Sequence, residues 1–434
     1  MDVSAIAIGF AIMLGLMLIG LPIAVVMAAT GVVGGVLAFG WPLVESMGPV
    51  MWGVMNEPLL TAIPLFILLG EIMLRSGMAD RMYSAMSLWL GRLPGGLLHT
   101  NIGCSALFAA TSGSSVATAA TIGTVASPAL EARGYDRARS LGSIAAGGTL
   151  GILIPPSVNL LIYGSLSETS IGQLFIAGIV PGILLTALFM LWIAVSHRDS
   201  QAGVDVAERA STREKLQSLL ALLPPAFIFT VVMGSIYAGI ATPTESAALG
   251  VVAALLLAAI GGKLSVAFFE RCFVQTARTT GMVLLIVLCA FLLNLTLSLT
   301  GAAQAMTAWV TSLGIGTTAL LLLLIVFYVL LGTVMDVLSM MVLTIPIAVP
   351  VVSAVGVDPV WFGIFIILMC ELGMITPPVG MNLYVVQGVR TDGGSFSDVV
   401  RGAFPYVLIM LGFVLVLMAV PSLVTWLPRT MLGT

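Results

Sequence analysis

Two short stretches that combine Gly, Pro-Pro and Asn are the parts of this sequence best suited to binding an ion or a small solute. They read GGTLGILIPPSVNLLIYG at residues 147–164 and ELGMITPPVGMNLYVVQG at residues 371–388. A Pro pair removes two amide donors and fixes two φ angles, so a helix cannot pass straight through either point. Because both stretches are otherwise apolar, we predict two membrane helices broken at mid-depth, with main-chain carbonyls and amides free to hold a ligand.

Two polar interruptions accompany these breaks. TSGSS, at residues 111–115, splits the apolar run 95–130, and GTVMDVLS, beginning at Gly332, splits the run 317–352. Arginines flank both ends of the first run, which favours a re-entrant hairpin with its tip inside the membrane. Two full spans joined by a very short external turn remain the alternative.

The tips and breaks together supply what a dehydrated sodium ion needs, namely several neutral oxygens from hydroxyls and unwound main chain. We therefore predict two sodium sites, each pairing one tip with the break of the same half. The predicted ligands are Ser112, Gly113, Ser114, Gly151, Ile154 and Pro156 in the first site, and Gly332, Thr333, Gly373, Met374 and Thr376 in the second. No further cofactor is expected, because the four Cys and two His are too scattered for zinc or haem.

A carboxylate substrate suits the same region, because half-helix N-termini present amide donors to an anion. The predicted substrate-binding residues are Ser157, Asn159, Asp336 and Asn382. Asp336 is the sharpest candidate, since an ionisable group deep in a span is functional by default; the alternative is a loop Asp near the surface. For Ser and Gly the alternative role is close helix packing and hydrogen bonding to the preceding turn.

Three glutamates have less defined roles. Thr242, Pro243 and Glu245 form a capping-box pattern with Pro at the first helical position, so helix initiation alone accounts for Glu245. Glu71, Glu371 and Arg75 fit either ion pairs or the lining of a site, and the sequence leaves both open.

Composition sets the class of protein. Hydrophobic residues make up 59% of the chain and charged residues 8%, which predicts an all-α polytopic membrane protein in a lipid bilayer. The net charge of −3 does not indicate a nucleic-acid-binding protein, which is typically strongly basic.

The apolar pattern divides into two halves joined by a hydrophilic linker. The first repeat, 1–196, contains predicted spans at 4–20, 22–40, 59–74 and 171–195, a loop at 41–57 and a basic interfacial helix at 75–92. The linker is 197–218. The second repeat, 219–434, contains predicted spans at 219–237, 245–260 and 281–299, a basic interfacial segment at 263–271, an amphipathic piece at 301–314 and a last span ending near Trp426.

The two halves also resemble each other in amino-acid sequence. At the constant spacing that superimposes Pro155 on Pro377, Gly151 meets Gly373 and TSGSS meets GTVMD. Lys and Arg favour cytoplasmic loops; with the arginine-rich loops inside, both termini lie outside. The hairpins then enter from opposite faces, which predicts an inverted repeat.

The order TSGSSVA, GGTLGILIPPS, TPTESAA, a membrane Asp and ITPPVGMN resembles the large membrane subunit (DctM type) of tripartite ATP-independent periplasmic (TRAP) transporters. The resemblance covers nearly the whole chain. It implies an elevator-type fold, sodium-coupled uptake of an organic acid across a bacterial inner membrane, a small four-helix membrane subunit and a periplasmic substrate-binding protein. It also implies sodium at the tips and breaks, with Asp336 near the substrate.

In some of these systems the small subunit is fused to the large one. No such segment begins this chain, so we expect a separate small subunit.

The leading hypothesis is thus a sodium-coupled secondary transporter for a small carboxylate. An ion channel or pore is the alternative, because it would use the same inverted segments. An intramembrane enzyme is disfavoured, since no second membrane Asp accompanies Asp336 and His99 lies near a boundary.

Overall fold

The computed structural model describes residues 3–196, 211–390 and 392–432, and the secondary structure of these residues is helical. Five of the described helices are long and apolar enough to cross a membrane, or up to eight spans if each bent pair is counted as one. The predicted class, an all-α polytopic membrane protein, is confirmed. Most of the predicted linker, 197–210, lies outside the described residues.

The helices of the first half follow the predicted order. They are α1 (Val3–Leu18), α2 (Ile23–Phe39), α3 (Pro42–Met55), α4 (Ala62–Arg75), α5 (Met78–Leu90), α6 (Leu97–Ser112), α7 (Ser115–Ala132), α8 (Arg137–Leu153), α9 (Val158–Ser167) and α10 (Ile171–Ser196). The prediction of a loop at 41–57 was wrong, because most of that segment is α3. Pro42 stands at its first position, where a missing amide costs nothing.

The helices of the second half follow the part of the linker that lies outside the described residues. They are α12 (Thr212–Ser218), the short 3-10 turn η1 (Leu219–Ala221), α13 (Leu223–Tyr237), α14 (Pro243–Ile260), α15 (Val266–Leu299), α16 (Ala302–Ser312), α17 (Thr317–Gly332), α18 (Val337–Ala354), α19 (Pro359–Met374), α20 (Met381–Val389), α21 (Phe396–Ala419) and α22 (Ser422–Leu432).

Two boundaries in this half were predicted wrongly. The basic segment and the span expected at 263–299 form one continuous helix of 34 residues, α15, because no Pro or Gly pair interrupts it. The last span ends at Ala419, and the short helix α22 follows it and packs against α10.

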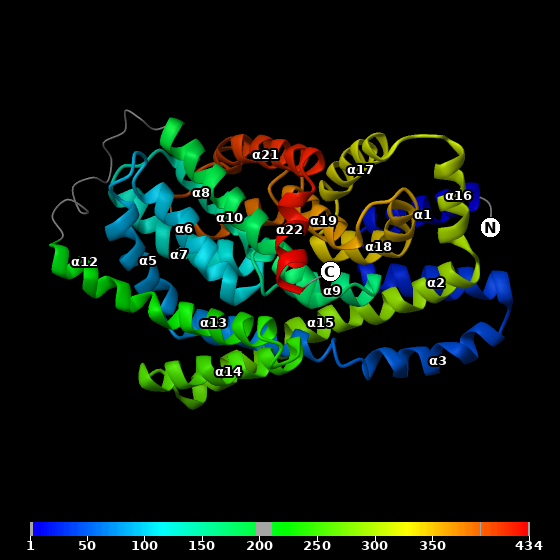
Figure 1. The fold of residues 1–434 in the computed structure, drawn as a ribbon, viewed down its shortest axis with the longest axis horizontal. Helices are drawn as coiled ribbons and strands as arrows, with labels where there is room; N and C mark the ends of the chain where they lie inside the picture. The colour runs from blue at the N-terminus through cyan, green and yellow to red at the C-terminus, as the bar shows by residue number, and fades with distance from the viewer. Residues whose placement is uncertain (1–2, 197–210, 391, 433–434) are drawn as a thin grey trace.

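The helices form two groups that lie side by side (Figure 1). One group contains α2, α3, α4, α13, α14 and α15. Of these, α2, α3, α13, α14 and α15 lie along the lower part of the view, and α4 packs against α14 and α15. The other contains α6 to α10 together with α17 to α22, and holds both predicted hairpins and both predicted breaks. Helices α5 and α16 lie next to the hairpins, where α5 contacts α6 and α16 contacts α18.

Both Pro-Pro pairs interrupt helices, as predicted. The axis bends by 43° between α8 and α9, with Pro155 and Pro156 in the gap. In the second half α19 ends at Met374 and α20 begins at Met381, with Pro377 and Pro378 between them.

Two glycines allow the main chain of α8, in the first broken helix, to pack directly against the main chain of α21. A Cβ placed on Gly142 of α8 would lie 2.1 Å from the carbonyl carbon of Gly402 in α21. A Cβ placed on Gly402 would lie 1.8 Å from the carbonyl oxygen of Ala138. Both neighbours are main chain, so neither helix has room for a side chain at this crossing.

We expect Gly402→Ala to destabilise the protein by about 1–3 kcal/mol, the usual cost of overpacking, because the two helices must separate. The matched control is Gly412→Ala in the same helix, where a Cβ meets nothing within 4 Å. Thermal unfolding in detergent should show a lower midpoint for the first variant only. Equal midpoints would contradict the close crossing.

Candidate ion and substrate site

The first hairpin tip packs directly on the first break. Gly113, between α6 and α7, adopts a left-handed φ of +61°, and a Cβ there would lie 2.8 Å from the carbonyl oxygen of Pro156. A Cβ on Gly151 would lie 2.6 Å from the carbonyl oxygen of Ser114. Glycine at both positions therefore lets the main chain of the tip and of the break meet.

Hydroxyl groups organise this first tip. The Ser114 Oγ accepts a hydrogen bond from the amide of Ala117 at 3.3 Å and so caps α7. Thr118 Oγ1 donates to the Ser114 carbonyl at 2.8 Å and lies 3.0 Å from Ser112 Oγ. Ser112 is buried, so the tip is a compact cluster of neutral oxygens inside the protein.

Ile154 was predicted as a ligand through its main-chain carbonyl, and its side chain points away from the tip. It lies against α10, where a Cβ on Gly182 would be 2.7 Å from its Cγ1. The neighbouring Leu153 carbonyl likewise faces Gly178 of α10. The structure thus brings Gly151 and Pro156 to the tip and directs the Ile154 side chain to a supporting helix.

The second tip meets the second break in the same manner. A Cβ on Gly332 would lie 2.7 Å from the Cα of Gly373, and the amide of Val379 donates to the Thr333 carbonyl at 3.3 Å. The hydroxyls of Thr333 and Thr376 each donate to a carbonyl of the preceding turn, at 2.7 and 2.6 Å. Their oxygen lone pairs stay available as acceptors. Met374 is buried beside them.

Asp336 caps α18. Its Oδ2 accepts from the amides of Leu338 and Ser339 at 3.1 and 3.3 Å, and the Ser339 hydroxyl donates to Oδ1. It occupies the place that Ser114 holds in the first half, and its side chain is half-buried. Asp336 is therefore a cap that also brings a negative charge to the second tip.

The four predicted substrate residues lie on three elements. Ser157 is fully buried and caps α9 through the Leu160 amide at 3.4 Å, and Asn159 is buried in the first turn of α9. Helix α9 packs against α18, which Asp336 begins, whereas Asn382 lies on α20, which packs against α7. No hydrogen bond joins any two of these four side chains in the described part of the chain.

The structure settles two of the three glutamates. Glu71 pairs with Arg75 one turn later, at 2.9 Å from its Nε. Glu245 completes a capping box with Thr242, as the sequence predicted.

The third glutamate, Glu371, is an acceptor that the sequence did not assign. It is fully buried, and the Ser115 hydroxyl donates to its Oε1 across the two halves of the chain. Ser115 stands in the quoted TSGSS motif but was not among the predicted ligands. Its spacing gives no signal of this contact, because 256 residues separate the partners.

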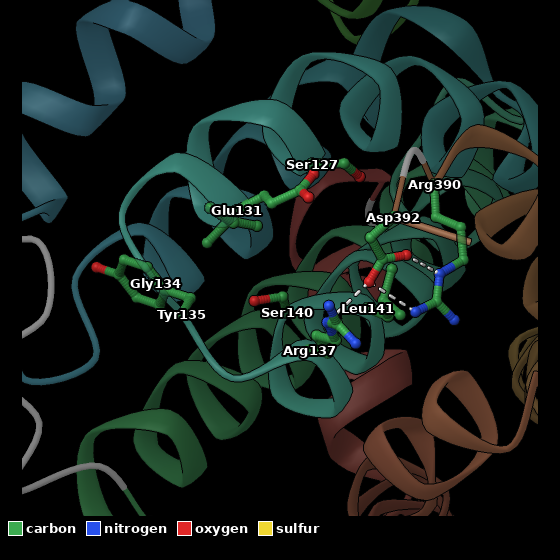
Figure 2. Close-up of a pocket in the computed structure, with 10 residues that line it drawn as sticks. Ser127, Glu131, Gly134, Tyr135, Arg137, Ser140, Leu141, Arg390 and Asp392 are labelled. Carbon is green, nitrogen blue, oxygen red and sulfur yellow. Dashed lines mark hydrogen bonds and ion pairs between the residues drawn. The ribbon is translucent and has the colours of Figure 1, made fainter. Parts of the chain in front are cut away.

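A cavity of about 240 Å³ lies at the end of α7 and the start of α8, beside the loop that follows α20 (Figure 2). Asp392 joins these elements by ion pairs with Arg390 and Arg137, the latter at 3.0 Å. The hydrogen bond from Arg390 lowers the pKa of Asp392 to about 2. The residues of the two hairpin tips do not line this cavity, so it is not part of the candidate ion site. It lies on the side of the fold that carries Arg137 and Arg390.

Comparison with known proteins agrees with this architecture. The family model described as "Tripartite ATP-independent periplasmic transporter, DctM component" matches residues 10–423. The chain belongs to this family. It is therefore a TRAP transporter large permease, an integral membrane protein that takes up solute with a periplasmic binding protein, and not an enzyme.

Individual relatives span the same length. The chain is 33% identical over 395 residues to the C4-dicarboxylate TRAP transporter large permease protein DctM of Pseudomonas aeruginosa, covering 91% of this chain and 92% of that protein. It is 34% identical over 428 residues to the sialic acid TRAP transporter large permease protein SiaM of Vibrio cholerae, covering 97% of each. The crystal structure of the Alcanivorax borkumensis YdaH transporter shares the fold, with a TM-score of 0.60 at 16% identity over 92% of this chain and 96% of that one.

We expect Gly332→Ala to reduce solute uptake roughly tenfold or more, because its Cβ would push the second tip off the second break and binding sites tolerate displacements of only about 0.5 Å. Gly281→Ala in α15 is the control, since a Cβ there meets nothing within 4 Å. Uptake per folded protein is the measurement. Wild-type uptake by Gly332→Ala would contradict the tip–break contact as a functional element.

Proposed function

We propose that this permease couples the uptake of a small organic acid to sodium entry. The observation that carries the proposal is the pairing of each hairpin tip with the break of its own half, through Gly113 with Pro156 and Gly332 with Gly373. Each junction gathers main-chain carbonyls and hydroxyls of neutral residues at one spot. Such oxygens are the ligands that a dehydrated hard cation requires.

The organic-acid substrate is supported by the relatives. They include large permeases named for C4-dicarboxylate, 2,3-diketo-L-gulonate and sialic acid. The half-helix N-termini of α9 and α20 offer amide donors for such an anion. We assign Ser157, Asn159 and Asn382 to its recognition, with Asp336 placing negative charge near the cation of the second tip.

The division into two helix groups supports an elevator-type movement. The group with the hairpins and breaks would slide against the group formed by α2, α3, α4, α13, α14 and α15, with α5 and α16 connecting them. We further propose the bacterial inner membrane as the location, a small four-helix subunit as partner, and the arginine-rich side with Arg390 as the cytoplasmic face.

Sodium should stabilise the protein independently of any substrate. Exchanging potassium for sodium at constant ionic strength should raise the unfolding midpoint, because an ion at 100 times its Kd adds about 2.7 kcal/mol to the folded state. Thr376→Val, which keeps the shape and removes the hydroxyl, should lose roughly half of this sodium effect if the two tip sites contribute equally.

Thr230→Val is the matched control, since Thr230 is an exposed threonine of α13 whose hydroxyl also donates to the preceding turn, at 2.8 Å. It should keep the full sodium response. If wild-type protein in proteoliposomes, with its membrane and periplasmic partners, takes up solute equally well in potassium alone, the sodium assignment is wrong.

A further inference from the structure

A buried carboxylate joins the two halves between the tips. Glu371 lies in α19 two residues before Gly373, and Ser115 directly follows Ser114 at the first tip. The hydrogen bond from Ser115 Oγ to Glu371 Oε1 therefore connects the tip of the first half with the break of the second. Both residues are almost entirely buried, at 1% and 0% exposure.

The second oxygen of this carboxylate is unsatisfied. The main chain of Ile152 lies close to the Glu371 carboxyl, but Oε2 makes no hydrogen bond of good distance and angle with the described residues. The ion pairs among the described residues involve other carboxylates. Within those residues, no Lys, Arg or His forms an ion pair with Glu371. A buried carboxylate without a counter-charge is strongly unfavourable, so this group either holds a proton or has a cation beside it, and sodium binding distinguishes the two.

A buried amide lies in the same region. Asn382 of α20 is 0% exposed, and neither its Oδ1 nor its Nδ2 has a hydrogen-bond partner among the described residues. Its Nδ2 and the carbonyl oxygen of Ser115 lie 3.0 and 3.3 Å from the point that a Cβ on Gly148 would occupy. The bare main chain of Gly148 thus lets α20 and the first tip approach the same spot on α8.

We propose that Glu371, Ser115 and Asn382 form a third sodium site, distinct from the two tip sites because it carries a full negative charge. Asn382 would give its Oδ1 to the cation, and its Nδ2 is the atom left for the substrate anion assigned to it above. The Glu371 carboxylate, the Asn382 amide oxygen and the Ser115 oxygens are hard ligands that suit sodium. A cation held here touches α7, α19 and α20 at once and so ties the first tip to the second break. This site rests on the sodium coupling proposed above.

Equilibrium binding of radioactive sodium to the full chain, purified with its small membrane subunit, tests the site. Glu371→Gln removes the charge but keeps an acceptor for the Ser115 hydroxyl, so the variant should fold. We expect it to bind one sodium ion fewer per chain than the wild type. Glu71→Gln, which removes the carboxylate paired with Arg75, is the control and should bind as many ions as the wild type.

The outcomes separate this site from the proposed function. Wild-type sodium binding by Glu371→Gln overturns the third site and leaves the tip sites standing. A wild-type chain that binds no sodium overturns the coupling itself. If Glu371→Gln does not fold, Asn382→Leu decides, because it keeps a similar volume without the amide oxygen: loss of one ion supports the site, and no loss overturns it.

Discussion

The fold depends on finding partners for the main-chain groups that two Pro-Pro pairs release inside an apolar chain. Without water, each free carbonyl or amide must meet protein or a ligand. The structure meets this need by pressing a hairpin tip onto each break, and glycine makes the contact possible. Gly113 lies against the Pro156 carbonyl, and Gly332 lies against Gly373. The same contacts that support the backbone collect the oxygens proposed to hold sodium.

The two halves solve this problem with different chemistry. Ser114 caps α7 with a neutral hydroxyl, whereas Asp336 caps α18 with a carboxylate at the corresponding position. The first tip is buried, while Val334 at the second tip is 40% exposed. The second junction is therefore the more accessible and the more negative of the two. Glu371 lies between them, so the proposed cation-binding region would extend across both halves instead of forming two isolated points.

Much of this arrangement was predictable because it is encoded locally. Proline breaks a helix through its own ring and missing amide, and the Thr242–Glu245 capping box spans a single turn, so both were found from a few adjacent letters. The contact of Ser115 with Glu371 and the turn of Ile154 toward α10 depend on how distant helices pack, which no local pattern specifies. The continuity of α15 was missed for a related reason: its charges suggested a surface segment, but nothing in its backbone stops the helix. The repeat boundaries and the ligand roles of the tip residues remain predictions.

We propose that a cation lies where each hairpin tip meets a helix break. The most direct measurement is a pair of high-resolution density maps of the full complex, one prepared in sodium and one with choline replacing it. The account predicts discrete density within ligand distance of the Ser114 and Pro156 carbonyls, and of Thr333 and Thr376, only in sodium. Identical maps, with these oxygens bonded solely to protein in both, would contradict it.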